Sequence, residues 1–199
     1  MAASSSASRR PGGPAPDAGG TTLTGLPPIE PAPPASARVL VLGSMPGAAS
    51  LRAGRYYAHP RNAFWPILAG LLGEDAQAPY DTLAAAAAAH GVAIWDVLHR
   101  CVRPGSLDAD IVPASVQAND FAAFYARHPC LRLVCLNGRA AAALYRRHVA
   151  PRVALPPGAS LHALPSTSPA HAAMARQAKQ AAWHAALAPH LSPAARGPA

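Results

Sequence analysis

The fold is decided by the stretch RVLVLGSMPG, residues 38–47. Its first six residues form a short apolar run that ends in glycine, which is typical of a buried strand. The glycines at 43 and 47 and the proline at 46 predict a tight, stiff turn whose bare backbone amides are open to a ligand. An ordinary turn between a strand and a loop fits these five residues equally well.

Three more runs along the chain carry a similar strand signature: GVAIWDV at 91–97, LRLVCL at 131–136 and SLHAL at 160–164. Helices are predicted between and after the strands, at 62–72, 81–90, 119–127, 138–149 and 174–188. Asp81 is suited to cap the second of these helices, and either Asn119 or Asp120 is suited to cap the third.

Strands that alternate with helices predict an α/β fold of three layers (αβα), with a central, mainly parallel sheet of four strands. In such folds ligands bind in the crevice outside the carboxyl ends of the strands. Three polar or Gly/Pro-rich loops follow strands in this sequence, at 43–47, 137–138 and 165–169. We therefore expect these loops to converge on one edge of the sheet.

The composition limits the function classes. The formal net charge of +8 favours a polyanionic partner such as nucleic acid, although a basic tail alone can produce it. Lys179 is the single lysine, so nearly all of the positive charge is on arginine, which suits contacts with phosphate. Three cysteines without CxxC spacing argue against a disulfide framework and an iron–sulfur cluster. The nine histidines show no metal-ligand spacing, so we expect no metal and no cofactor.

The domain organisation follows from local composition. Residues 1–37 are rich in Ser, Gly, Pro and Ala and predict a disordered tail, 38–190 predict the folded domain, and 191–199 predict a flexible end. The sequence shows neither a signal peptide nor an apolar stretch of about 18 residues, so we expect a cytoplasmic protein without a membrane span.

The segment YYAHPRNAFW, residues 56–65, is the strongest candidate for recognition chemistry. A pocket for a base that has left its stack needs an aromatic face and a group that reads the base edge. Asn62 offers a donor and an acceptor together. It also fits as a plain helix cap, and Tyr56 and Trp65 fit as core residues. Asp96, at the end of the second predicted strand, suits a base edge or a water but ranks below Asn62, because such aspartates often cap a turn.

Taken in order, GSMPG, YYAHPRNAFWP, LNG and LPSTSPAHA resemble the uracil-DNA glycosylase superfamily. The stretch 56–65 is similar to the FAHPxNRFW-like stretch of the mismatch-specific branch. The match to the hypoxanthine-DNA (DNA-deoxyinosine) glycosylase branch, family six, is closer, and IWDVL at 94–98 and GSLDADI at 105–111 belong to it. The resemblance spans residues 38–190 and implies a monofunctional glycosylase that flips and excises deaminated bases during base excision repair.

Two departures from most of the superfamily change the expected site. Met45 stands where an Asn or Asp usually positions the attacking water, and Leu164, Pro165 and Ser166 stand where a His or Asn usually precedes the serine. The hypoxanthine branch resembles this chain in both losses. The resemblance therefore implies that Asn62 and Asn137 carry the catalysis.

The other site residues are implied in two groups. Tyr57 would stack on the base, and the pocket wall would comprise Gly43, Ser44, Met45, Pro46, Gly47 and Asp96. DNA contacts are expected from His59, Arg61, Arg139, Ser166, Thr167, Ser168 and His171. No lysine occurs in these loops, which argues against a Schiff-base lyase step.

The function predicted from the sequence is therefore hypoxanthine excision from DNA by a monomer associated with the nucleoid. The alternatives are a glycosylase for uracil or mismatched bases and a noncatalytic DNA-binding member of the same superfamily. A small-molecule α/β hydrolase is disfavoured because the sequence has no Gly-x-Ser-x-Gly motif.

Overall fold

The structure is a computed structural model that describes residues 20–192. Its main sheet contains four parallel strands in the order β3-β2-β6-β7. The strands are β2 (Val39–Gly43), β3 (Val92–Asp96), β6 (Leu133–Asn137) and β7 (Ser160–Leu164). The two central strands, β2 and β6, are buried along nearly their whole length, which explains why they are continuous apolar runs.

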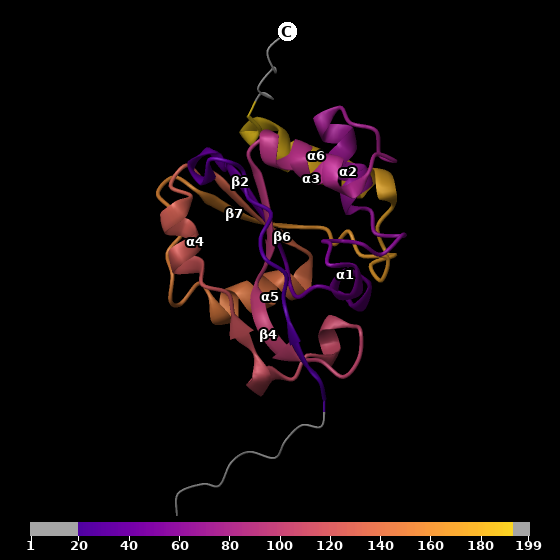
Figure 1. Ribbon diagram of the computed structural model, residues 1–199, viewed down its shortest axis with the longest axis vertical. Helices are drawn as coiled ribbons and strands as arrows, with labels where there is room; N and C mark the ends of the chain where they lie inside the picture. Colours follow the sequence, from indigo (N-terminus) through magenta and orange to yellow (C-terminus); the bar gives the residue numbers. More distant parts are fainter. Residues whose placement is uncertain (1–19, 193–199) are drawn as a thin grey trace, which may run out of the picture.

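Helices cover both faces of this sheet (Figure 1). One group is α2 (Phe64–Leu72), α3 (Tyr80–Ala89) and α6 (Arg176–Leu187), which contact one another through α2. The other group is α4 (Phe121–Arg127) and α5 (Arg139–His148). The three-layer arrangement predicted from the sequence is confirmed, and the predicted ends of these strands and helices lie within two residues of the observed ones.

Two capping predictions have different outcomes. Asp120 caps α4 as predicted, because its carboxylate accepts a hydrogen bond of 3.0 Å from the amide of Ala123. The prediction for Asp81 is wrong: α3 begins at Tyr80 after Pro79, and Asp81 lies within the first turn without a capping bond. Pro79 occupies the N-cap position, so no side chain caps this helix.

A second, antiparallel sheet was not predicted. It contains β1 (Thr22–Thr24), β4 (Leu98–Val102) and β5 (Gln117–Ala118), in the order β1-β4-β5. Strand β4 begins directly after Asp96 and Val97, so the chain passes from one sheet into the other at the carboxyl end of β3. The short helix α1 (Ala48–Ala53), after the first loop, was also missed.

The expectation of a loose tail over 1–37 is wrong for the part that the structure describes. Beyond β1, Ile29 exchanges two backbone hydrogen bonds of 2.9 Å with Ile94 and so covers part of the free edge of β3. Residues 1–19 and 193–199 lie outside the described residues, so the predictions for them are not addressed. Within the predicted flexible end, Leu191 packs against the core and the amide of Ser192 donates to the carbonyl oxygen of His90.

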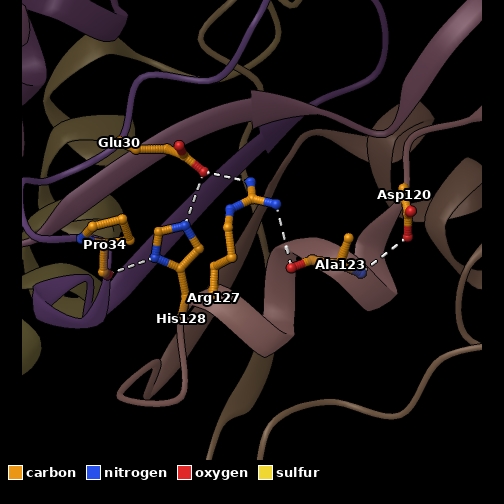
Figure 2. Close-up of polar contacts among 6 residues, drawn as sticks. All are labelled: Glu30, Pro34, Asp120, Ala123, Arg127 and His128. Carbon is orange, nitrogen blue, oxygen red and sulfur yellow. Dashed lines mark hydrogen bonds and ion pairs between the residues drawn. The ribbon is translucent and has the colours of Figure 1, made fainter.

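A polar cluster fastens this N-terminal segment to α4 (Figure 2). The Glu30 carboxylate accepts hydrogen bonds from Arg127 at 2.8 Å and from His128 at 2.9 Å. The other ring nitrogen of His128 lies 2.6 Å from the carbonyl oxygen of Pro34. Burial opposes ionisation of Glu30, but the hydrogen bonds and charges of His128 and Arg127 together hold its pKa below the ordinary value. The cluster therefore supports the segment that the composition had suggested to be loose.

Candidate active site at the carboxyl edge of the main sheet

The loop after β2 is held from outside by the segment that follows β4. Ser44 Oγ donates a hydrogen bond of 2.7 Å to Asp108, and Arg103 donates one of 2.7 Å to the carbonyl oxygen of Pro46. The carbonyl oxygens of Gly43 and Ser44 accept backbone bonds at 2.9 and 3.0 Å. The Met45 side chain is buried in the hydrophobic core. The loop is therefore held at several points, and its side chains at 44 and 45 have protein partners.

Asp96 and Tyr57 meet beside Gly43. Asp96 pairs with Gly43 in the register of β2 and β3, and its carboxylate occupies the space that a Cβ on Gly43 would need. The Tyr57 hydroxyl lies 3.5 Å from the same point. Tyr57 has a positive φ of 55°, and its ring packs on Phe64 with centroids 4.0 Å apart. A side chain larger than hydrogen at 43 would thus displace both groups.

Asp96 is 4% exposed and its environment is unusual for a carboxylate. Burial, reinforced by the negative charge of Asp108 and opposed by Arg103, raises its pKa to about 8. Among the described residues, three buried side-chain atoms have no hydrogen-bond partner, and they are Tyr57 OH, Asp96 Oδ2 and Arg103 Nε. Such atoms are uncommon in native structures and often mark functional positions.

Asn137, at the end of β6, is held by the loop after β7. Its Nδ2 donates to Thr167 Oγ1 at 2.9 Å, and its Oδ1 accepts from the Thr167 amide at 2.9 Å. The next residue, Gly138, has φ 93° and ψ 173°, and a Cβ there would lie 2.7 Å from the Cβ of Ser166. Glycine is required here because the two loops approach so closely. The prediction that these strand-end loops converge is confirmed.

Asn62 lies in the turn before α2. Its Oδ1 accepts a hydrogen bond of 3.0 Å from the Phe64 amide, so the side chain acts as a local cap. The neighbouring Ala63 amide donates to the Thr167 carbonyl oxygen at 3.0 Å, which joins this turn to the loop that holds Asn137. Asn62 and Asn137 are therefore linked through one residue, Thr167, which is 1% exposed.

A groove of about 250 Å³ opens where this turn, the loop after β7 and α6 meet. Four basic side chains line it, and the lining contains no acidic residue. The groove is formed by Pro60, Arg61, Asn62, Ala63, Pro66, Thr167, Ser168, Pro169, His171, Ala172, Met174, Arg176 and Lys179. Its positive charge suits an anionic ligand.

The groove includes a residue that sequence reasoning missed. Lys179 lies on α6, is 6% exposed, and donates through Nζ to the carbonyl oxygen of His171. It is absent from the loops that carry the sequence motifs, so only tertiary packing reveals it. Arg103 was missed as a support of the first loop for the same reason, whereas Asp108 lies in the GSLDADI motif but its contact with Ser44 was not predicted. The one available signal was that Lys179 is the only lysine in a chain rich in arginine.

Other predicted residues lie apart from these groups. His59 and Arg139 are exposed and do not line the groove, although His59 accepts a bond of 3.1 Å from the Arg61 amide through Nδ1. Ser166 lies against Gly138 at the junction of the two loops. Within residues 20–192, no group of His, Cys, Asp or Glu side chains forms a metal-binding cluster. No helix in the same range is long and apolar enough to cross a membrane.

Comparison with known proteins agrees with this geometry. The model of the family described as "Uracil DNA glycosylase superfamily" matches residues 31–191. Two proteins named hypoxanthine DNA glycosylase are each 36% identical to the chain, one from Methanosarcina barkeri over 102 residues and one from Methanosarcina acetivorans over 104. These matches cover 51% and 52% of this chain and 63% and 65% of the relatives.

A solved structure supports the same assignment of the fold. The solution NMR structure of a Methanosarcina acetivorans protein, provisionally assigned as a uracil DNA glycosylase, superposes with a TM-score of 0.68 at 28% identity. The alignment covers 83% of this chain and 96% of that one.

Proposed function

Because the chain belongs to the uracil DNA glycosylase superfamily, we propose that it is a monofunctional DNA glycosylase that excises deaminated bases, chiefly hypoxanthine. One observation carries the proposal: Asn137 and Asp96 end two strands at one edge of the sheet, and the turn of Asn62, which lines a basic groove, is joined to Asn137 through Thr167. The names of the two relatives from Methanosarcina support hypoxanthine as the principal base.

The two asparagines are oriented to donate. In each, a backbone N–H points at the amide oxygen, from Phe64 to Asn62 and from Thr167 to Asn137. A backbone N–H can only donate, so Oδ1 must face it and Nδ2 must face away. Asn137 uses one of its two Nδ2 protons on Thr167. The remaining N–H groups are available to a base on which negative charge develops, where one well-placed donor contributes ~3 kcal/mol.

The other residues of the proposed pocket come from the same edge of the sheet. Tyr57 contacts the base, and the wall comes from Gly43, Ser44, Met45, Pro46, Gly47 and Asp96. Because Met45 is buried and apolar, it contributes surface and does not polarise water. Excision requires the base to leave the duplex stack, so the mechanism includes base flipping.

The basic groove is the proposed path of the DNA backbone. Arg61, Ser168 and His171 line it together with Arg176 and Lys179, and phosphate contacts of this kind position a duplex without reading its sequence. His59, Arg139, Ser166 and Thr167 are proposed to extend the contact to either side. We expect the protein to act as a monomer on nucleoid DNA in the cytoplasm.

The monofunctional assignment survives the discovery of Lys179 in the groove. A Schiff base requires a neutral amine that reaches the sugar, whereas Lys179 is 6% exposed and its Nζ is turned to the His171 carbonyl oxygen, to which it donates a hydrogen bond. We therefore propose that water, and not this lysine, attacks C1′ of the sugar. Preference for uracil is the second candidate, supported by the assignment of the Methanosarcina acetivorans structure.

The test uses labelled duplexes that each contain one inosine, uracil or xanthine. After incubation with the full chain, alkali cleaves the abasic sites and the products are separated by size. We expect the fastest cleavage at inosine. Faster cleavage at uracil would transfer the assignment to the second candidate, and binding without cleavage of any substrate would leave a DNA-binding protein.

A further inference from the structure

Two neighbouring side chains in the wall of the proposed base pocket each carry a buried oxygen without a hydrogen-bond partner. Asp96 Oδ2 and Tyr57 OH are both buried and lack hydrogen-bond partners. The two side chains meet beside Gly43, where Asp96 Oδ1, the other oxygen of the carboxyl group, and the Tyr57 hydroxyl approach the same point. Burying an unpaired polar group costs about 1–3 kcal/mol, so a pair of them in one place indicates a ligand that supplies the missing partner.

Backbone groups of Asp96 and Val97, and not the Asp96 carboxyl group, make the hydrogen bonds that hold the end of β3. Its carbonyl oxygen accepts a hydrogen bond of 2.8 Å from Asn119, and the Val97 amide donates to the Gly43 carbonyl oxygen. The carboxyl group is not used as a cap. Its role therefore has to be sought in the pocket.

The charges that face Asp96 come from several elements. Asp108 follows the small sheet and adds negative charge, whereas Arg103 adds positive charge but is committed to the Pro46 carbonyl oxygen. Tyr57 and Tyr56 also face it, and their hydroxyl groups stay protonated because burial and the charge of Asp96 raise their pKa values. Asp96 thus lacks a strong cationic partner in a dry site.

Resting on the proposed function, we propose that Asp96 acts as a neutral carboxylic acid that donates a hydrogen bond to the O6 carbonyl oxygen of hypoxanthine, beside the Tyr57 hydroxyl. Neither oxygen is exposed to solvent, so the base reaches them when a part of the pocket wall moves. The two groups then form a pair of uncharged donors around one oxygen. A carboxylic acid kept neutral by an apolar site is able to donate in this way at neutral pH.

Cleavage of the bond between the sugar and the base requires hydrogen-bond donors at O6 of hypoxanthine. The C1′–N9 bond breaks with its electron pair on the base, and the ring places part of that negative charge on O6. Water adds to C1′, and the proton that the water loses balances the proton that the departing hypoxanthine takes up. Asp96 keeps its own proton throughout. An ionised carboxylate here would repel the charge on O6 and slow the step.

The test is the pH dependence of single-turnover inosine excision by the wild type, Asp96→Asn and Asp96→Ala. The pKa of Asp96 lies at about 8, so the wild-type rate constant should be level below pH 7 and fall about tenfold per pH unit above pH 8. Asp96→Asn keeps a donor that cannot ionise, so it should retain the rate within about tenfold at pH 7 and lose this decline. Asp96→Ala should be slower by ~100-fold or more at pH 7.

Asp96→Asn also controls for ionisation of the inosine base. This ionisation affects the pH dependence of the rate equally in the wild type and in Asp96→Asn, so the difference between their profiles reports on Asp96. Tyr57→Phe removes the second donor and should slow excision at every pH without moving the midpoint. A wild-type rate that rises with pH, together with an inactive but folded Asp96→Asn, would show that Asp96 is a base and would overturn the proposal. If Asp96→Asn does not fold, a wild-type rate that rises with pH would still overturn the proposal, and Asp96→Ala would then serve as the comparison for a decline. Absence of excision at every pH would instead refute the proposed glycosylase.

Discussion

Replacing Gly138 with alanine tests the junction that holds Asn137. The residue has φ 93° and ψ 173°, a region that is essentially restricted to glycine and costs other residues about 1–3 kcal/mol. The new methyl group would lie 2.7 Å from the Cβ of Ser166, and overpacking of this kind costs about 1–3 kcal/mol more. We expect Gly138→Ala to lower the free energy of unfolding by roughly 2–6 kcal/mol.

Gly73→Ala is the matched control. Gly73 also has a positive φ, 74°, but a Cβ there would meet nothing within 4 Å. Its substitution should cost only the left-handed conformation, about 1–2 kcal/mol. With a urea dependence of about 2 kcal/mol/M, the midpoints should fall by about 1–3 M for Gly138→Ala and about 0.5–1 M for Gly73→Ala.

The assay is equilibrium unfolding in urea, followed by inosine excision under conditions in which both variants are folded. Excision should fall in Gly138→Ala and not in Gly73→Ala, because only the first change moves the loop that orients Asn137. Equal midpoint shifts for the two variants would refute the close contact between the loops. A normal excision rate in a destabilised Gly138→Ala would refute the link between that contact and Asn137.

Four further predictions concern single side chains. Asn62→Ala should slow inosine excision by ~100-fold or more with a stability loss of about 1 kcal/mol; near-normal excision would leave Asn62 only its cap on α2. Arg61→Ala should weaken binding to duplex DNA and lower the slope of log K against log salt by about 1, with the rate of bound substrate unchanged. Borohydride should trap no covalent adduct with abasic DNA; an adduct that Lys179→Gln abolishes would contradict the monofunctional mechanism. Glu30→Gln should lower the free energy of unfolding at neutral pH. Because the pKa of Glu30 is lowered, the difference in stability from wild type should vanish as the pH falls below the ordinary value of 4.5. A difference that persists in acid would mean that the contact with His128 does not depend on charge.

The main sheet could be predicted because its strands are short apolar runs that end in glycine or a polar residue, as at Gly43 and Asn137. The small antiparallel sheet could not. Strand β4 has the sequence LHRCV, which does not alternate between apolar and polar residues, and only Val97 separates it from β3; β5 has two residues. Strand β1 lies within a segment whose Pro and Gly content suggests disorder. These strands form because segments that are distant in the sequence pair with each other, and the local sequence does not indicate that pairing.

The same limit applies to the site. The motifs identified Asn62, Asn137 and the first loop, because each lies beside a strand or helix boundary. Lys179 and Arg103 reach the site from elements whose local sequence suggests packing only, and no spacing rule connects them to the loops that they contact. Residues that support a site from another element become visible only when the tertiary structure is known.

Asp96 shows how the structure changes the order of candidates. From the sequence alone, Asp96 is a weaker candidate for the site than Asn62, because an aspartate at the end of a strand often caps a turn. In the structure the positions are reversed: Asn62 Oδ1 caps α2, whereas the Asp96 carboxyl group caps nothing and keeps an unpartnered oxygen. An amide that caps a helix through its oxygen still has two N–H donors, so the finding does not remove Asn62 from catalysis. It adds a second source of donors at the inner end of the pocket. Since both sets of donors are uncharged when Asp96 is protonated, the proposed mechanism stabilises a departing anion without placing a fixed charge against the neutral base that has to bind first.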